Sequence, residues 1–181
     1  MSHQAPFPAD EGARIRALLD CNILDTDAEA AFDGLTRSIS QVCNTPVALV
    51  SLVDRERQWF KSRLGLDDTE MPRELAFCGH VILYPELMVV PDTHESGTFR
   101  DHPLVTGDPH IRFYAGAPLE LNRGERVGAL CVIDWAPRNL TGDQLDALRA
   151  HAVIASEILE LRRSIGLLER ELAERDNRSA A

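Results

Sequence analysis

The sequence predicts an α+β fold, in which β-hairpins lie between helices at the two ends of the chain. Short apolar runs that are separated by tight turns, at residues 47–62 and 111–134, indicate the hairpins. Apolar residues recur at helical spacing near the N-terminus. A third observation is a segment without proline that runs from Thr141 to the end of the chain and predicts a long C-terminal helix.

The N-terminal part is expected to hold a leader over residues 1–11 and then two helices. Apolar spacing predicts the first helix over residues 14–24 and the second over residues 29–43, and Pro46 ends this region. Residues 47–53 form a nearly continuous apolar run, which is typical of a central strand.

The middle of the chain continues with the partner strand of the first hairpin, residues 58–62. Alternation places Trp59 and Lys61 on one face of this strand and Phe60 on the other. The elements expected next are a loop at 65–72, a short helix at 74–83, a short strand at 87–90 and a long polar loop at 91–110. A polar loop of that length beside a sheet is typical of a ligand site.

The C-terminal part is expected to contain the second hairpin and the long helix. Residues 111–121 and 126–134 are its strands, and the alternation in the first of them separates Arg112 and Tyr114 from Phe113. Thr141 and Gln144 have the spacing of a capping box at the start of the helix.

Composition limits the classes of function. The chain has 181 residues, 44% of them apolar, which suits one domain plus an appendage that folds without disulfides or metal. Its net charge, 19 − 29 = −10, disfavours non-specific binding to nucleic acid or to anionic membranes. The four cysteines match no zinc spacing, and neither a signal peptide nor a membrane-spanning run is evident. These features favour a reduced, cytoplasmic protein.

Several short motifs occur in a characteristic order. They are Ile23–Thr26, Val50–Asp54 with Arg57–Ser62, Glu74–His80, Val89–Asp92, Ile111–Leu119 and Gly128–Asp134. Together they resemble the GAF domain family over roughly residues 12–163, and most of all the GAF modules that precede bacterial histidine kinases and diguanylate cyclases. The resemblance implies a GAF-like antiparallel sheet with helices packed on its faces, and a ligand pocket walled by residues 74–84 and 91–110. It divides the chain into a leader at 1–11, a GAF-like domain at 12–150, a coiled-coil-like helix extension at 151–175 and a tail at 176–181.

The sequence also departs from particular GAF subgroups. Bilin-binding modules use adjacent cysteine and histidine, whereas Gly79 separates Cys78 from His80 here, so we expect no covalent chromophore. Cyclic-nucleotide-binding modules carry an Asn-Lys-x-x-x-Phe motif, which the single lysine of this chain excludes. No known catalytic motif is present, so we expect no enzyme. We expect no output domain after the helix, and thus a stand-alone module with a histidine kinase or diguanylate cyclase as a separate partner.

The candidate ligand-binding residues are Cys78, His80, Asp92, Phe99, Arg112 and Tyr114. Arg112, Tyr114 and Asp92 offer a guanidinium, a phenol and a carboxylate to a polar ligand. Alternatively, Tyr114 packs in the core and Arg112 forms a structural ion pair with Asp92 or Asp101. Cys78 and His80 are either a reactive pair or a buried thiol beside a hydrogen-bonded wall residue.

Three histidines in the long loop suggest a metal site. His94, His102 and His110 alternate with aspartates, but their eight-residue intervals match no known ligand spacing. We therefore expect no metal, and the identity of any small-molecule ligand stays open.

An apolar stripe on the C-terminal helix predicts a parallel homodimer. Its members, spaced alternately three and four apart, are Ile154, Ile158, Leu161, Ile165, Leu168 and Leu172. A second stripe, including Leu148 and Ala152, is expected to pack on the sheet. A long amphipathic helix folded back on its own domain is the alternative.

Three functions follow from these observations. The first is a sensory or regulatory module that binds a small molecule and signals through dimerisation or a partner protein. The second is a dimerisation and protein-interaction module whose pocket is filled by side chains. The third is a small redox enzyme that uses Cys78 or Cys131, which requires a second cysteine within disulfide reach.

Overall fold

The computed structural model describes residues 4–179, which contain a six-stranded antiparallel sheet. The strands are β1 (Val47–Val53), β2 (Arg57–Leu64), β3 (Glu70–Pro72), β4 (Met88–Val90), β5 (Phe113–Glu120) and β6 (Arg126–Asp134). Their order across the sheet is β3-β2-β1-β6-β5-β4. The two predicted hairpins, β1–β2 and β5–β6, are joined at the centre of the sheet, where β1 pairs with β6. The predicted α+β class and antiparallel sheet are confirmed.

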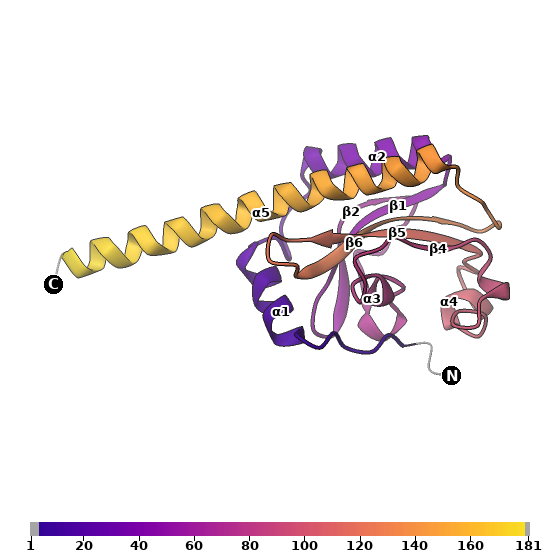
Figure 1. The fold of residues 1–181 in the computed structure, drawn as a ribbon, viewed down its shortest axis with the longest axis horizontal. Coiled ribbons are helices and arrows are strands. Elements are labelled where there is room, and N and C mark those ends of the chain that lie inside the picture. The colour runs from indigo at the N-terminus through magenta and orange to yellow at the C-terminus, as the bar shows by residue number, and fades with distance from the viewer. Residues whose placement is uncertain (1–3, 180–181) are drawn as a thin grey trace.

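Helices cover both faces of the sheet. They are α1 (Glu11–Asp20), α2 (Ala30–Cys43), α3 (Cys78–Val81), α4 (Pro103–Thr106) and α5 (Gly142–Ser179), with 3₁₀ turns η1 (Arg73–Leu75) and η2 (Thr93–Glu95). The long helices α2 and α5 lie side by side over one face, while the short α3 and α4 lie on the opposite side (Figure 1). The C-terminal part of α5 extends well beyond the sheet (Figure 1).

Strand alternation sends apolar side chains to two separate clusters. Along β1, Ala48, Val50 and Leu52 join the cluster under α2 and α5, which we call the helix-side cluster. Val47 and Leu49 from the same strand join a second cluster under α3 and α4, the loop-side cluster. Trp59 and Phe60 were predicted to lie on opposite faces of their strand, as were Phe113 and Tyr114. Both predictions are confirmed, because the two members of each pair belong to different clusters.

The first helix begins and ends earlier than the spacing predicts. It starts at Glu11 and stops at Asp20, because Asn22 adopts a left-handed conformation with φ 47° that ends the helix. Ile23 continues the apolar pattern from the following turn, and its side chain is still fully buried in the helix-side cluster. Ile23 therefore fits the helical spacing because its side chain is buried, although it lies after the end of the helix.

The expected helix over residues 74–83 is divided into two short turns. Ala76 is extended (φ −81°, ψ 111°) and separates η1 from α3. The loop expected at 65–72 also contains β3, which extends the sheet beyond β2. The long polar loop at 91–110 includes η2 and α4. Turn-rich segments such as these take their local structure from tertiary contacts, which periodicity does not report.

The C-terminal helix begins as predicted. The Thr141 amide donates to Gln144 Oε1 (2.9 Å) and the Gln144 amide donates to Thr141 Oγ1 (3.3 Å), the two bonds of a capping box. Gly166 does not interrupt the helix. A Cβ atom at this position would lie 2.7 Å from Asn22 Nδ2, so glycine allows α5 to pack closely against the turn after α1.

Candidate functional site

A cavity of about 370 Å³ lies between the sheet and the short elements on its loop side. Strands β1, β2, β5 and β6 supply its floor, and the segments at 65–78 and 104–111 supply its wall. Its lining residues are Val47, Leu49, Gln58, Gly65, Leu66, Asp67, Asp68, Met71, Leu75, Phe77, Cys78, Leu104, Asp108, Pro109, Ile111, Tyr114, Cys131, Ile133 and Trp135. The volume is in the range that small-molecule sites occupy.

A thiol and hydroxyl cluster forms the inner end of the cavity. Cys78 Sγ lies 3.1 Å from Ser51 Oγ, 3.1 Å from the Tyr114 hydroxyl and 3.9 Å from Cys131 Sγ. All four side chains are buried, and they come from α3, β1, β5 and β6. Cys78 and Cys131 are far apart in the sequence, and no local pattern predicts that they meet.

The two thiols of this cluster differ in acidity. The hydrogen bond with Cys131 is the largest cause that lowers the pKa of Cys78, and the hydrogen bonds with Ser51 and Tyr114 also lower it, whereas burial raises it. The same Cys78–Cys131 bond raises the pKa of Cys131, and burial adds to that effect. By contrast, burial raises the pKa of Cys21 to about 12 and that of Cys43 to about 11. Cys78 is therefore the thiol best suited to lose its proton.

Close packing along β5 positions the Tyr114 side chain. A Cβ atom at Gly116 would lie 2.5 Å from the Tyr114 hydroxyl oxygen, so the absence of a side chain leaves room for the phenol. Burial raises the pKa of Tyr114 well above its ordinary value, so the phenol stays protonated and is available as a hydrogen-bond donor.

The six predicted ligand-binding residues do not gather in one place. Cys78 and Tyr114 line the cavity, whereas His80, Asp92, Phe99 and Arg112 are not among its lining residues. Phe99 stacks on Phe77 with ring centroids 4.3 Å apart, and His80 meets the Phe99 ring edge-on at 5.0 Å. These two residues therefore support the cavity wall from behind.

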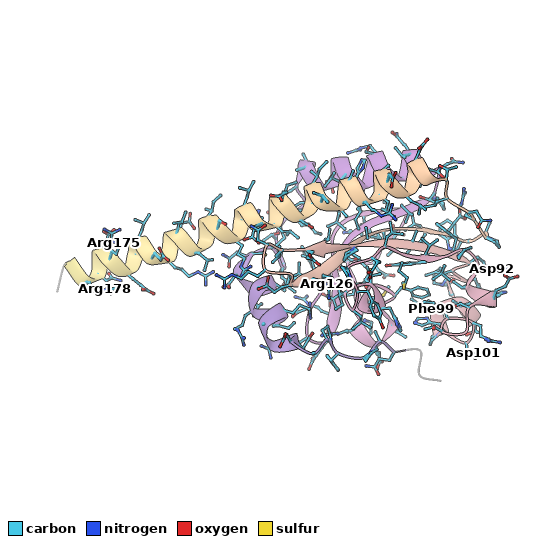
Figure 2. All side chains as sticks on the ribbon, viewed as in Figure 1. Asp92, Phe99, Asp101, Arg126, Arg175 and Arg178 are labelled. Carbon is cyan, nitrogen blue, oxygen red and sulfur yellow. The ribbon has the colours of Figure 1, made fainter. Side chains whose placement is uncertain are left out.

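Asp92 and Arg112 form the ion pair that the alternative interpretation describes. Arg112 Nε and Nη2 donate to the two carboxylate oxygens of Asp92 at 3.0 and 2.7 Å. This pairing lowers the pKa of Asp92. Figure 2 shows Asp92 at the outer edge of the molecule, with Phe99 pointing inward. The pair joins the start of the long loop to the residues just before β5.

Sequence reasoning missed the polar residues that do line the cavity. Gln58 is only 3% exposed, and its Oε1 has no hydrogen-bond partner among the residues that the structure describes. Gln58 lies two residues before Phe60, on the same face of a buried strand, and this position could have indicated that its side chain is buried. Asp67, Asp68 and Asp108 also line the cavity and are exposed at its mouth. They come from two loops whose proximity no local pattern encodes.

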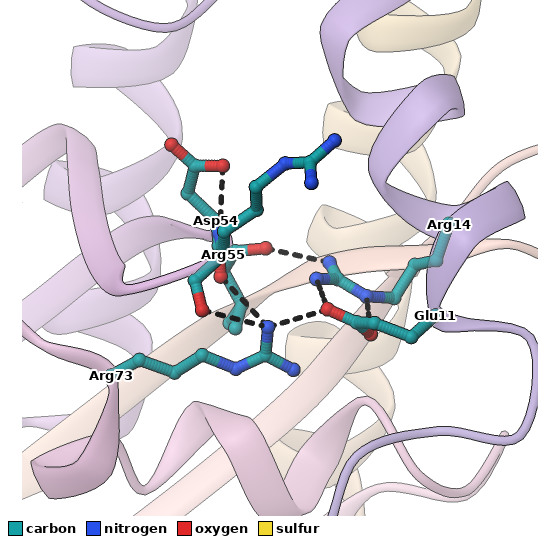
Figure 3. A network of polar contacts seen from close by, with 6 residues as sticks. Glu11, Arg14, Asp54, Arg55 and Arg73 are labelled. Atoms are coloured by element: carbon teal, nitrogen blue, oxygen red, sulfur yellow. Dashed lines mark hydrogen bonds and ion pairs between the residues drawn. The ribbon is translucent and has the colours of Figure 1, made fainter.

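An ion-pair network holds the wall segment on the sheet. Glu11 accepts hydrogen bonds from Arg14 and Arg73, and these two arginines also donate to the backbone carbonyls of Val53 (2.6 Å) and Asp54 (2.9 Å) (Figure 3). The network thus connects α1, the β1–β2 turn and η1, which leads directly into the wall residues Leu75 and Phe77.

Comparison with known proteins identifies the family. The family model for the GAF domain matches residues 27–159. A cyclic di-GMP phosphodiesterase of Pseudomonas aeruginosa is 38% identical over 146 residues, which are 81% of this chain but only 25% of that protein. The chain therefore spans about a quarter of the length of this relative. Within residues 4–179, no helix has both the length and the apolar character needed to cross a bilayer.

Solved structures agree with the fold. The GAF domain of Thermosynechococcus elongatus PixJ, in its blue-light-absorbing form, superposes with a TM-score of 0.64 at 17% identity, covering 88% of this chain and 95% of that one. The GAF domain of an Acinetobacter phosphoenolpyruvate-protein phosphotransferase gives a TM-score of 0.62 at 14% identity, covering 85% and 97%. At these identities the likeness concerns the fold alone. With the family match and the six-stranded sheet in agreement, this chain belongs to the GAF domain family, a family of sensory modules.

Proposed function

We propose that this chain is a sensory domain that binds a small molecule in the cavity and signals through a homodimer formed by α5. The cavity of about 370 Å³ beneath the 104–111 segment is the observation that carries the proposal. Its floor belongs to a rigid sheet and its wall to short turns, an arrangement in which a ligand can be enclosed. A module whose pocket is filled by side chains would lack such a volume.

Two strands connect the cavity to α5. Tyr114 and Cys131 face the cavity from β5 and β6, while Phe113 and Val132 on the opposite faces of the same strands belong to the helix-side cluster. Leu148 of α5 is fully buried in that cluster. A ligand that shifts β5 or β6 would therefore act on α5 through one layer of packed side chains.

The predicted dimer stripe on α5 is available for a partner. Leu161, Ile165, Leu168 and Leu172 are each 57–63% exposed, Ile154 is 49% exposed, and Ile158 partly packs on its own domain. The opposite stripe of the helix, with Ala152, Ala155 and Leu159, is buried. A regular row of exposed apolar residues on a helix favours burial against a second helix.

The output of the module is proposed from its relatives. A cyclic di-GMP phosphodiesterase contains a segment like this chain, and a domain of a putative two-component sensor histidine kinase protein from Sinorhizobium meliloti has a similar fold. We propose that α5 delivers the signal to such an output domain in the cytoplasm. The activity of that relative is not transferred to this chain, because the matched region is a quarter of its length.

Native mass spectrometry of protein purified from its own organism tests ligand binding. Wild type should carry a non-covalent additional mass, and Leu104→Trp, which adds volume at the cavity wall, should lose it. No part of the mass should survive denaturation, since we expect no covalent chromophore. A mass that persists in Leu104→Trp would place the ligand elsewhere and contradict the proposal.

Sedimentation equilibrium tests the dimer with a matched pair of variants. Leu168→Glu places a charge in the stripe and should convert the dimer to a monomer. Leu167→Glu makes the same change one position away, outside the stripe, and should leave the dimer intact. A wild-type chain that is monomeric at micromolar concentration would end the dimer proposal.

The contact between Cys78 and Cys131 favours cysteine-dependent redox chemistry as a second candidate function. Their sulfurs, 3.9 Å apart, would need to approach to about 2.05 Å to form a disulfide. In this proposal the Cys78 thiolate attacks a peroxide oxygen, the O–O bond breaks, and the released hydroxide takes up a proton as water. The Cys131 sulfur then attacks Cys78 Sγ, the S–O bond breaks, and a second water leaves with the Cys131 proton. The two thiols supply the two electrons that reduce the peroxide.

Intact-mass analysis after alkylation tests this chemistry. Hydrogen peroxide should remove two hydrogens from wild type and should protect Cys78 and Cys131 from alkylation, with recovery after reduction. Cys131→Ser should stop at a sulfenic acid on Cys78, and Cys21→Ser should behave like wild type. Equal alkylation of both cysteines before and after peroxide would remove this candidate.

A further inference from the structure

We infer that the cavity is selective for a small, largely apolar ligand that carries a cationic amine and a hydrogen-bonding group, and that it rejects anionic ligands. The inference rests on the proposed function, since it names the class of ligand for the same cavity. Three independent features lead to it: the apolar walls of the cavity, a buried amide oxygen without a hydrogen-bond partner, and the negative charge at the cavity mouth.

The apolar walls of the cavity indicate that most of the ligand is apolar. Leu49 and Ile133 on the sheet face Leu75, Phe77 and other apolar side chains of the wall across the cavity. Such walls favour a compact apolar or aromatic body that displaces water from both sides. The volume of about 370 Å³ accommodates a two-ring aromatic molecule and excludes much larger ligands such as cyclic dinucleotides.

Gln58 requires a polar group on that body. Its side chain is 97% buried and lines the cavity, and its Oε1 has no hydrogen-bond partner within residues 4–179. A buried amide oxygen without a hydrogen-bond donor is unfavourable unless something supplies one. Because the surrounding walls are apolar, a donor carried by the ligand would provide the missing hydrogen bond.

The charge at the mouth determines the sign of the ligand. Asp67, Asp68 and Asp108 line the cavity, are exposed, and take part in no ion pair with any residue in the described range 4–179. The lining residues, all within that range, include no arginine, lysine or histidine. The chain as a whole has a net charge of −10. Aspartates that are free of arginine partners, at the opening of a low-dielectric cavity, attract a cation and repel an anion.

Isothermal titration calorimetry with three probes of one shape tests the inference. The probes are 2-naphthylmethylamine, 2-naphthylmethanol and 2-naphthoate, which share an aromatic body and differ in charge at neutral pH. In low salt the amine should bind at least about tenfold more tightly than the carboxylate, with the alcohol between them. Raising the salt concentration should narrow that difference, because the aspartates are exposed to counterions.

Two triple variants with the same change of net charge test whether the aspartates at the mouth cause the preference for the amine. The triple variant Asp67→Asn, Asp68→Asn, Asp108→Asn should reduce the preference for the amine over the alcohol, which share a hydrogen-bond donor and differ in charge, to about twofold or less. A control at the far end of α5, with Glu169→Gln, Glu171→Gln and Asp176→Asn, changes the net charge by the same amount and should preserve the preference. These control residues are exposed, and the C-terminal end of α5, which carries them, extends away from the sheet (Figure 1).

Gln58→Met tests the buried amide with a side chain of similar length. It should weaken the binding of the amine and of the alcohol by a similar factor of about five to tenfold, and therefore leave the preference between amine and alcohol unchanged. Equal binding of all three probes, or a preference for the amine over the alcohol that survives the triple aspartate variant, overturns the inference and leaves the proposed function standing. If none of the probes binds at millimolar concentration, both the inference and the proposed cavity function fail.

Discussion

The two faces of the sheet are built from the same strands but closed in different ways. Over one face, α2 and α5 are 14 and 38 residues long and present continuous apolar rows to the sheet. Over the other, η1, α3 and α4 have three or four residues each. The long helices leave a tightly packed cluster with Phe32, Leu52 and Leu148 fully buried. The short turns leave a cavity.

Element length explains this difference. A long amphipathic helix repeats apolar residues every three or four positions, so that one element can cover a sheet without gaps. Short turns change direction after a few residues and cannot present such a row. The helix side is therefore suited to stabilising the fold and to transmitting a structural change along α5, and the loop side is suited to ligand binding. Four measurements test this difference between the two faces.

Matched leucines on one strand should give the largest effect. Leu52 is 0% exposed in the helix-side cluster, and Leu49 is 1% exposed but borders the cavity. Leu52→Ala should lower the free energy of unfolding by about 4 kcal/mol, and Leu49→Ala by about 2 kcal/mol, because a side chain beside empty volume has fewer packing contacts to lose. Urea denaturation of both variants measures the difference. Equal losses would mean that the loop side is packed as well as the helix side.

A substitution on the loop side should increase stability. Gln58→Leu removes a buried amide whose oxygen has no partner among the described residues, so the free energy of unfolding should rise by about 1–2 kcal/mol without ligand. On the helix side, the buried hydroxyl of Thr36 is 2.9 Å from Ser62 Oγ, so Thr36→Val should be destabilising instead. Thermal denaturation of the two variants should therefore move Tm in opposite directions. A lower Tm for Gln58→Leu would show that the amide has a partner after all.

Acid should weaken the attachment of the cavity wall. Burial would raise the pKa of Glu11, but hydrogen bonds from Arg14 and Arg73 outweigh it and lower the pKa from 4.5 to about 2. Because the pKa is lower in the folded state, this stabilisation is present above about pH 4.5 and is lost as the pH falls toward 2. Glu11→Gln should cost about 1 kcal/mol at pH 7, an amount reduced by solvent screening of this partly exposed group.

Hydrogen exchange gives the measurement for that prediction. At neutral pH, Glu11→Gln should increase amide exchange in α3 more than in α2, because the network holds η1, which precedes α3 (Figure 3). Near pH 2 the wild type and the variant should have the same stability. A stability difference that does not change with pH would show that the carboxylate charge is unimportant.

The N-terminal segment before α1 should give the smallest effect. The Arg73 guanidinium lies 4.4 Å from the centre of the Phe7 ring, and Phe7 is 60% exposed. Phe7→Ala should cost about 0.5 kcal/mol, the usual value of an exposed cation–π contact. Phe7→Leu keeps an apolar side chain but lacks the ring, and should lose most of the same amount. If Phe7→Leu matches wild type in chemical denaturation, the contact is only hydrophobic.

Local sequence patterns predicted the fold well where elements are long or regular. Both hairpins, the two faces of β5 and the capping box of α5 followed from alternation and spacing. The division of residues 74–83 did not, because the extended backbone at Ala76 arises from tertiary contacts. The predicted ligand-binding residues lie in different places in the structure. Cys78 and Tyr114 line the cavity, while Arg112 and Asp92 form the alternative ion pair at the surface.

The pattern of strands and helices, and with it the family, can be predicted from the sequence, because alternation and helical spacing are local properties of the chain. Which polar groups meet in the cavity depends on the tertiary structure. Cys78 and Cys131 are 53 positions apart, and Asp68 and Asp108 belong to different loops. The pairing of β1 with β6 joins the two hairpins into one floor, and the short turns then lie across it. Such contacts depend on packing between distant segments, which no local pattern records.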